Sequence, residues 1–146
     1  MKIKFAAGFA LATMLAFSAP AIAQESSYTP GDYWDVSDID VLDGQYDSYM
    51  DYLAGPWKAQ QEWAKSKGYI KSYKVVANNY PRDGEPDLYL IVVYPKVYDN
   101  AEQERQRKEF HAFMKADSRA MGKAYAERGT MRKAKGSAQL QEVILK

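Results

Sequence analysis

Hydrophobic and polar positions along this chain follow two different periods. Four short segments rich in Tyr, Ile, Val and Leu predict β-strands. These segments are residues 33–41, 69–78, 87–94 and 140–145. In the first, Trp34 and Val36 fall on one face and Ile39 and Val41 on the other, and a bulge is expected near Ser37-Asp38.

Two longer segments carry apolar residues at spacings of three and four, which predicts helices. The first, residues 45–67, contains Gly55-Pro56. Because proline lacks a backbone donor, a kink or a break into two abutting helices is expected there. Asp99 or Asn100 can cap the second helix, which should end near Arg128.

The order β-α-β-β-α-β predicts an α+β fold. With right-handed crossovers it forms a four-stranded antiparallel sheet with both helices on one face, the ferredoxin-like arrangement. Residues 88–94 are apolar without alternation, so both faces of that strand need a cover, and the helices supply only one. A second copy of the chain is the simplest other cover, and burying ~600–800 Å² gives a gross ~15–20 kcal/mol before association costs. A homodimer is therefore expected.

The first residues have the pattern of a cleaved secretory signal. Lys2 and Lys4 precede an apolar run over residues 5–17, and Ala21-Ile22-Ala23 matches a signal-peptidase site. The run is shorter than the ~20 residues that span a bilayer, so no membrane span is expected. The predicted organisation is a signal over residues 1–23 and one domain over residues 24–146. Together with the absence of cysteine, it indicates the bacterial periplasm.

Charge is unevenly distributed although the net charge is only +1. Residues 24–57 hold eight acidic and no basic residues, whereas residues 101–146 hold eleven basic and six acidic ones. This excess is too weak for nucleic-acid binding. The basic residues 130–136 predict a flexible loop, and charged ends of this kind leave open an envelope interaction module.

No established catalytic or metal-binding pattern is present. The chain has no cysteine and a single histidine, His111, so the common zinc and copper centres are excluded. Asp38, Asp40 and Asp43 have the wrong spacing for an EF-hand loop. No serine has the surroundings of a nucleophile elbow, and no glycine-rich phosphate loop appears. These absences favour a non-catalytic protein without a cofactor, and an enzyme or a haem-binding protein is the alternative.

The element order, the segment Tyr52-Leu53-Ala54-Gly55-Pro56-Trp57-Lys58 and the Gly68-Tyr69 entry to the second strand resemble the dimeric α/β-barrel superfamily. The similarity is greatest to its NIPSNAP-type and antibiotic-biosynthesis-monooxygenase-type branches. The resemblance implies subunits that dimerise sheet to sheet. The superfamily contains haem-degrading enzymes, cofactor-free monooxygenases and members of unknown role, so membership does not select a reaction.

Aromatic residues on the strands are the remaining candidates for a site, because Tyr and Trp combine an apolar body with a polar tip. A small aromatic or lipophilic ligand could bind among Trp34, Tyr73, Tyr89, Tyr94 and His111. His111 is either a haem ligand or proton shuttle, or a boundary histidine with one hydrogen bond. The leading hypothesis is a periplasmic homodimer of ferredoxin-like subunits that is non-catalytic or binds a small ligand. The alternatives are a cofactor-independent monooxygenase or haem-binding enzyme, and an envelope interaction module.

Overall fold

The computed structural model describes residues 25–146, so the predicted signal over residues 1–23 lies outside the described part. The strands are β1 (Tyr28–Val41), β2 (Ser72–Ala77), β3 (Leu88–Tyr94) and β4 (Arg132–Leu145). The helical segments are α1 (Tyr46–Tyr52), η1 (Leu53–Trp57), α2 (Lys58–Ser66), α3 (Asn100–Met114), α4 (Ser118–Glu127) and the short η2 (Arg128–Thr130).

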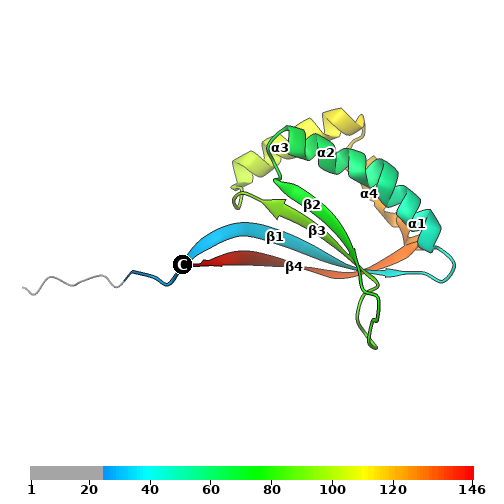
Figure 1. The fold of residues 1–146 in the computed structure, drawn as a ribbon. Helices are drawn as coiled ribbons and strands as arrows, with labels where there is room; N and C mark the ends of the chain where they lie inside the picture. Colours follow the sequence, from blue (N-terminus) through cyan, green and yellow to red (C-terminus); the bar gives the residue numbers. More distant parts are fainter. Residues whose placement is uncertain (1–24) are drawn as a thin grey trace, which may run out of the picture.

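The four strands form one open sheet in the order β2-β3-β1-β4, and every neighbouring pair is antiparallel. The helices lie on one side of this sheet, while β1 and β4 continue beyond them as a two-stranded ribbon (Figure 1). The predicted α+β fold with a four-stranded antiparallel sheet is confirmed.

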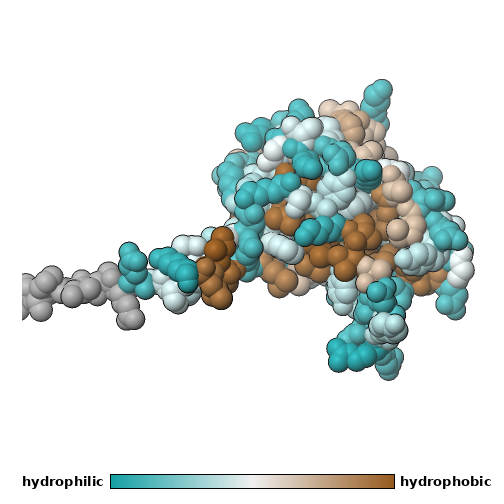
Figure 2. Space-filling model, viewed as in Figure 1, coloured by the Kyte–Doolittle hydropathy of each residue, from teal (hydrophilic) through white to brown (hydrophobic). Residues whose placement is uncertain are grey.

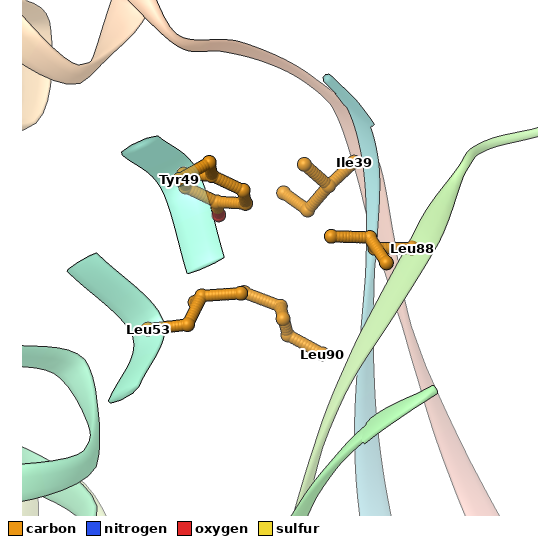
Figure 3. Packing of buried hydrophobic residues seen from close by; sticks show 5 residues of the cluster. All are labelled: Ile39, Tyr49, Leu53, Leu88 and Leu90. Atoms are coloured by element: carbon orange, nitrogen blue, oxygen red, sulfur yellow. The ribbon is translucent and has the colours of Figure 1, made fainter. Parts of the chain in front are cut away.

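The hydrophobic core lies at one end of the space between helices and sheet. Tyr49 and Leu53 point from the first helical segment toward Ile39, Leu88 and Leu90 on the strands (Figure 3). Side chains alternate between the faces of a strand, so these contacts identify the helix-facing side of the sheet. Ile39, Leu88 and Leu90 are on that side, and Trp34 and Ile91 on the other.

The first helical region runs from α1 through η1 into α2 without leaving a helical conformation. Pro56 lies inside η1, where the backbone forms one wide π-helical turn. A π-turn interrupts the regular i→i−4 ladder, which is the ladder that proline cannot complete. The interruption expected at Gly55-Pro56 is therefore a local widening, and Leu53 still reaches the core.

The second helical region differs from the prediction of one helix ending near Arg128, because it consists of α3 and α4. Lys115 adopts a left-handed conformation with φ of 52°, which ends α3. Asp117 then caps α4 by accepting a hydrogen bond from the Ala120 amide at 2.8 Å. The periodic apolar pattern continues across this break, which is why the pattern alone did not reveal it.

Both strands of the β1–β4 ribbon are longer than predicted. β1 begins at Tyr28 and β4 begins at Arg132. The prediction of a flexible loop over residues 130–136 is therefore wrong. Continuous pairing from Tyr28↔Leu145 to Val41↔Arg132 holds this polar sequence in a strand, because sheet context overrides local preference. The expected bulge does fall beside Asp38, but the extra residue is Lys135 on β4.

Asp99 gives α3 a complete capping box. Its carboxylate accepts from the Glu102 amide at 2.8 Å, and the Glu102 side chain accepts from the Asp99 amide. Asp99→Ala is expected to lower the free energy of unfolding by about 1 kcal/mol, since the Glu102 amide loses its acceptor. Urea denaturation measures this change. Asp51→Ala, at an exposed position of α1, is the control and should be close to neutral.

Candidate ligand-binding cleft

The β1–β4 half of the sheet has its polar side toward the helices. Asp35 and Ser37 face the helical layer, opposite Gln139 and Ser137 on β4. The apolar residues Trp34, Val36, Leu140 and Ala138 form the pairs on the outward side. Helices cannot bury an apolar face against such a surface, and α2, α3 and α4 contain no buried residue. Polar hollows therefore remain between the helices and this half of the sheet.

One of these hollows has a volume of about 440 Å³ and lies beside the core. We call it the arginine cleft. Tyr52 and Trp57 form its wall on the first helical region, and Ser37 and Ser137 belong to its floor on β1 and β4. Its other defining residues are Tyr125, Arg128 and Arg132. Aromatic walls and convergent polar groups are the usual composition of a small-molecule site.

Arg132 is the most unusual residue of the arginine cleft, because only 7% of this charged side chain is exposed. Its guanidinium carbon lies 4.6 Å from the centre of the Tyr125 ring. Arg128 lies 5.0 Å from the Tyr52 ring centre and 5.3 Å from that of Tyr125. The Tyr125 ring thus contacts both cations, which holds the two guanidinium groups in one region of the cleft.

Neither arginine forms an ion pair with a carboxylate within residues 25–146. No Asp or Glu belongs to the lining of the arginine cleft. Burying a cation without a paired anion is unfavourable, and charged residues are rarely buried in this state. The arrangement leaves guanidinium donors facing a hollow that an anion can enter.

Two tyrosines next to the arginines keep their protons at neutral pH. Burial is the main cause that raises the pKa of Tyr49 and of Tyr52, because it disfavours the phenolate. The nearby charges of Arg132 and Arg128 oppose this shift without cancelling it. Both tyrosines line the cleft, and the neutral hydroxyl of Tyr52 is available there as a hydrogen-bond donor.

A third cation at the rim is already compensated. Lys135 lies 3.3 Å from a carboxylate oxygen of Asp40 and donates to the Gly84 carbonyl at 2.6 Å. Gly84 belongs to the turn between β2 and β3, where its φ of 81° suits glycine. Lys135 therefore ties the β2–β3 connection to the rim, and the free positive charge of the cleft comes from Arg128 and Arg132.

The five aromatic and histidine residues proposed from sequence do not meet in one hollow of a single chain. Trp34 and Tyr89 point to the outward face of the sheet, and Tyr73 and Tyr94 to the helix-facing side. His111 is half-buried in the last turn of α3 and does not line the arginine cleft.

Three of these side chains have identified contacts. The Tyr73 hydroxyl donates to Glu62, and its ring lies edge-on to Trp57 with 5.4 Å between the centres. The Lys74 ammonium group lies 5.3 Å above the Trp34 ring. Tyr94 lines a separate hollow beneath α3.

Sequence reasoning missed the arginines because residues 130–136 were interpreted as a solvated loop. One signal was available. Tyr125 and Arg128 are three residues apart in the predicted helix, which places them on one side of it. Local composition did not show that Arg132 begins a strand, and it is this strand that places Arg132 in the cleft.

No protein-family model, curated protein or solved structure matches this chain. In residues 25–146, no helix is both long and apolar enough to cross a membrane. The same residues contain no cluster of three or more His, Cys, Asp or Glu side chains that could hold a metal ion. The functional argument therefore starts from the arginine cleft itself.

Proposed function

We propose that this protein is a non-catalytic binding protein for a small anionic ligand with a planar apolar body, and that the arginine cleft is its site. The observation that carries the proposal is Arg132, a buried cation without a carboxylate partner in the described chain. An anion that binds beside Arg132 pairs with this buried positive charge and offsets the cost of burying it.

The chemistry of the cleft favours a carboxylate or a similar oxyanion. A guanidinium group offers a rigid fork of donors that matches two oxygens of one anion. The hydroxyl of Tyr52 can add a neutral donor, and Gln60 and Gln61 line the same hollow. Hydrogen bonds to charged groups contribute about 1.5–3 kcal/mol each, so one arginine has a measurable effect on affinity.

The walls of the cleft favour a flat ligand body. Tyr52, Trp57 and Tyr125 present aromatic rings to the hollow. Aromatic rings pack in offset or edge-to-face geometries that add to the burial of apolar area. Because Trp57 lines the site, its fluorescence should report on occupancy.

The first test compares 2-naphthoate with its neutral isostere 2-naphthamide by isothermal titration calorimetry and tryptophan fluorescence. We expect the anion to bind and Arg132→Met to weaken it by about tenfold to a hundredfold. Methionine retains much of the arginine volume and removes a buried unpaired charge, so the melting temperature of the free protein should stay equal or rise.

Arg119→Met is the matched control, since Arg119 is exposed on α4 and does not line the cleft. It should leave naphthoate affinity unchanged. Equal binding of 2-naphthamide and 2-naphthoate would contradict the proposal, and so would unchanged naphthoate affinity in the Arg132→Met variant. Neither outcome depends on knowing the natural ligand.

The strand order β2-β3-β1-β4 supports a ferredoxin-like subunit, and the apolar outward face of the sheet supports a homodimer of the dimeric α/β-barrel type. Trp34, Val36, Ile91 and Val93 form adjacent cross-strand pairs on that face. In Figure 2, hydrophobic residues form a band between the mostly hydrophilic helical layer and the β2–β3 connection.

A subunit interface of standard size buries about 800 Å² on each partner, which is the scale of one face of a small sheet. The proposed dimer joins the outward faces and leaves the helix-facing arginine clefts open to solvent, one in each subunit. Export to the periplasm is part of the same proposal and rests on the segment Ala21-Ile22-Ala23 with its preceding apolar run. The proposal assigns no haem-ligand role to His111, because that residue does not line the cleft.

A further inference from the structure

We propose that the chain has a second binding site, for a neutral ligand rich in hydroxyl groups, in the hollow beneath α3. We call this hollow the glutamine pocket and define it by Asp35, Tyr94, Gln103, Gln106 and Gln139. This site is separate in chemistry from the arginine cleft, and its proposal does not depend on anion binding there.

Four elements converge on the glutamine pocket. β1, β3 and β4 contribute Asp35, Tyr94 and Gln139, and α3 contributes Gln103 and Gln106. The hollow has a volume of about 310 Å³. The Tyr94 ring lies edge-on to that of Tyr98, with 6.5 Å between centres and 79° between planes, so the pocket also has aromatic surface.

Not every hydrogen-bonding group in this pocket has a partner. The Nε2 atom of Gln106 is buried and has no partner within residues 25–146. A buried donor without a partner costs about 1–3 kcal/mol, so such atoms are uncommon in folded proteins. Gln139 donates to one Asp35 oxygen at 3.1 Å. Gln103 donates to the Tyr98 carbonyl at 2.8 Å, which fixes its amide at the pocket edge.

The mixture of donors and acceptors suits hydroxyl groups, which both donate and accept. Amides supply both functions, a carboxylate accepts, and a neutral phenol can donate. Burial and the Asp35 charge raise the pKa of Tyr94 to about 12, so its hydroxyl keeps the proton at neutral pH. The Lys96 charge at this rim is already paired with Glu102. Asp35 therefore disfavours an anionic ligand here, in contrast to the arginine cleft.

A smaller hollow between α2 and α3 lies beside both sites. It shares Gln60 and Gln61 with the arginine cleft, and Tyr94 and Gln106 with the glutamine pocket. The proposed anion site and the proposed hydroxyl site are therefore neighbours on the helix-facing side of the sheet.

The test is a titration of the full mature chain with D-glucose, followed by the side-chain amide signals of glutamine in ¹⁵N-HSQC spectra. We expect saturable shifts of Gln103, Gln106 and Gln139 with a dissociation constant in the millimolar range. Cyclohexanol, a ring of similar size with one hydroxyl, should not reproduce them. Gln106→Leu removes the orphaned amide and should weaken glucose binding by about tenfold. It should leave the melting temperature equal or higher.

Gln141→Leu is the control, because Gln141 is exposed on the same strand as Gln139 and lies outside the pocket. It should not change glucose affinity. Absence of saturable shifts, shifts equally produced by cyclohexanol, or unchanged affinity in the Gln106→Leu variant would overturn the proposal. Naphthoate binding is measured separately in the same variant. Its retention there would show that the two sites are independent.

Discussion

Leu88→Ala is expected to lower the free energy of unfolding by about 3–5 kcal/mol, a large part of the 5–15 kcal/mol typical of a domain. Only 1% of Leu88 is exposed, and the residue lies among Ile39, Tyr49, Leu53 and Leu90. Truncation removes the transfer energy of the side chain and leaves a cavity. The neighbours come from two strands and the first helical region, so they cannot easily collapse into it. Urea denaturation followed by circular dichroism measures the loss.

Val76→Ala is the matched control for the core prediction. Val76 lies on β2 next to Ala77, the strand partner of Leu88, but it points to the other face and is 43% exposed. We expect a change below about 1 kcal/mol for this variant. Equal losses in the two variants would show that the core does not lie where Ile39 and Leu88 meet.

Strands and helices could be predicted wherever the hydrophobic periodicity of a segment was strong and turn-forming residues lay at its ends. Leu88–Tyr94 is an example, because an apolar run between Gly84-Glu85-Pro86 and Pro95 has few alternatives to a strand. The helical region with Pro56 is another, since its spacing of apolar residues continues on both sides of the proline. In both, local sequence and the final fold agree.

The remaining elements depend on contacts between distant residues. Arg132 to Ser137 have no strand preference of their own, and they belong to β4 because residues 37–41 of β1 pair with them. The break between α3 and α4 rests on one left-handed residue, Lys115, within an unbroken apolar pattern. Neither the pairing nor the backbone conformation leaves a periodic signal.

The candidate sites, like the fold, could be predicted only in part from the sequence. Alternation along the first strand already placed Trp34 and Val36 on one face and Ile39 and Val41 on the other. What it did not contain was which face meets the helices. The structure places the polar face inside, with Asp35 and Ser37 in two hollows, and the apolar face outside. The proposed ligand sites on one side of the sheet and the proposed subunit interface on the other both follow from this arrangement of the two faces.

Ile91→Asp is expected to convert the proposed homodimer into monomers. Ile91 lies near the middle of the outward face, paired with Val36 on β1 and Lys74 on β2. Burying a carboxylate in an apolar interface removes it, and the neighbouring Lys74, from water. A cost of about 3–5 kcal/mol raises the dissociation constant of the dimer by roughly a hundredfold to several thousandfold. Sedimentation velocity of wild type and variant at equal micromolar concentrations measures the change.

The monomer should survive this substitution, because the new carboxylate lies directly opposite Lys74 and can pair with it at the surface of the isolated subunit. Circular dichroism should therefore show unchanged secondary structure. Tyr80→Asp is the control, since Tyr80 is 91% exposed in the β2–β3 connection and should leave the dimer intact. A wild-type protein that sediments as a monomer at tens of micromolar would refute the dimer. It would leave the arginine cleft untouched, because that cleft is built from the opposite face of the same sheet.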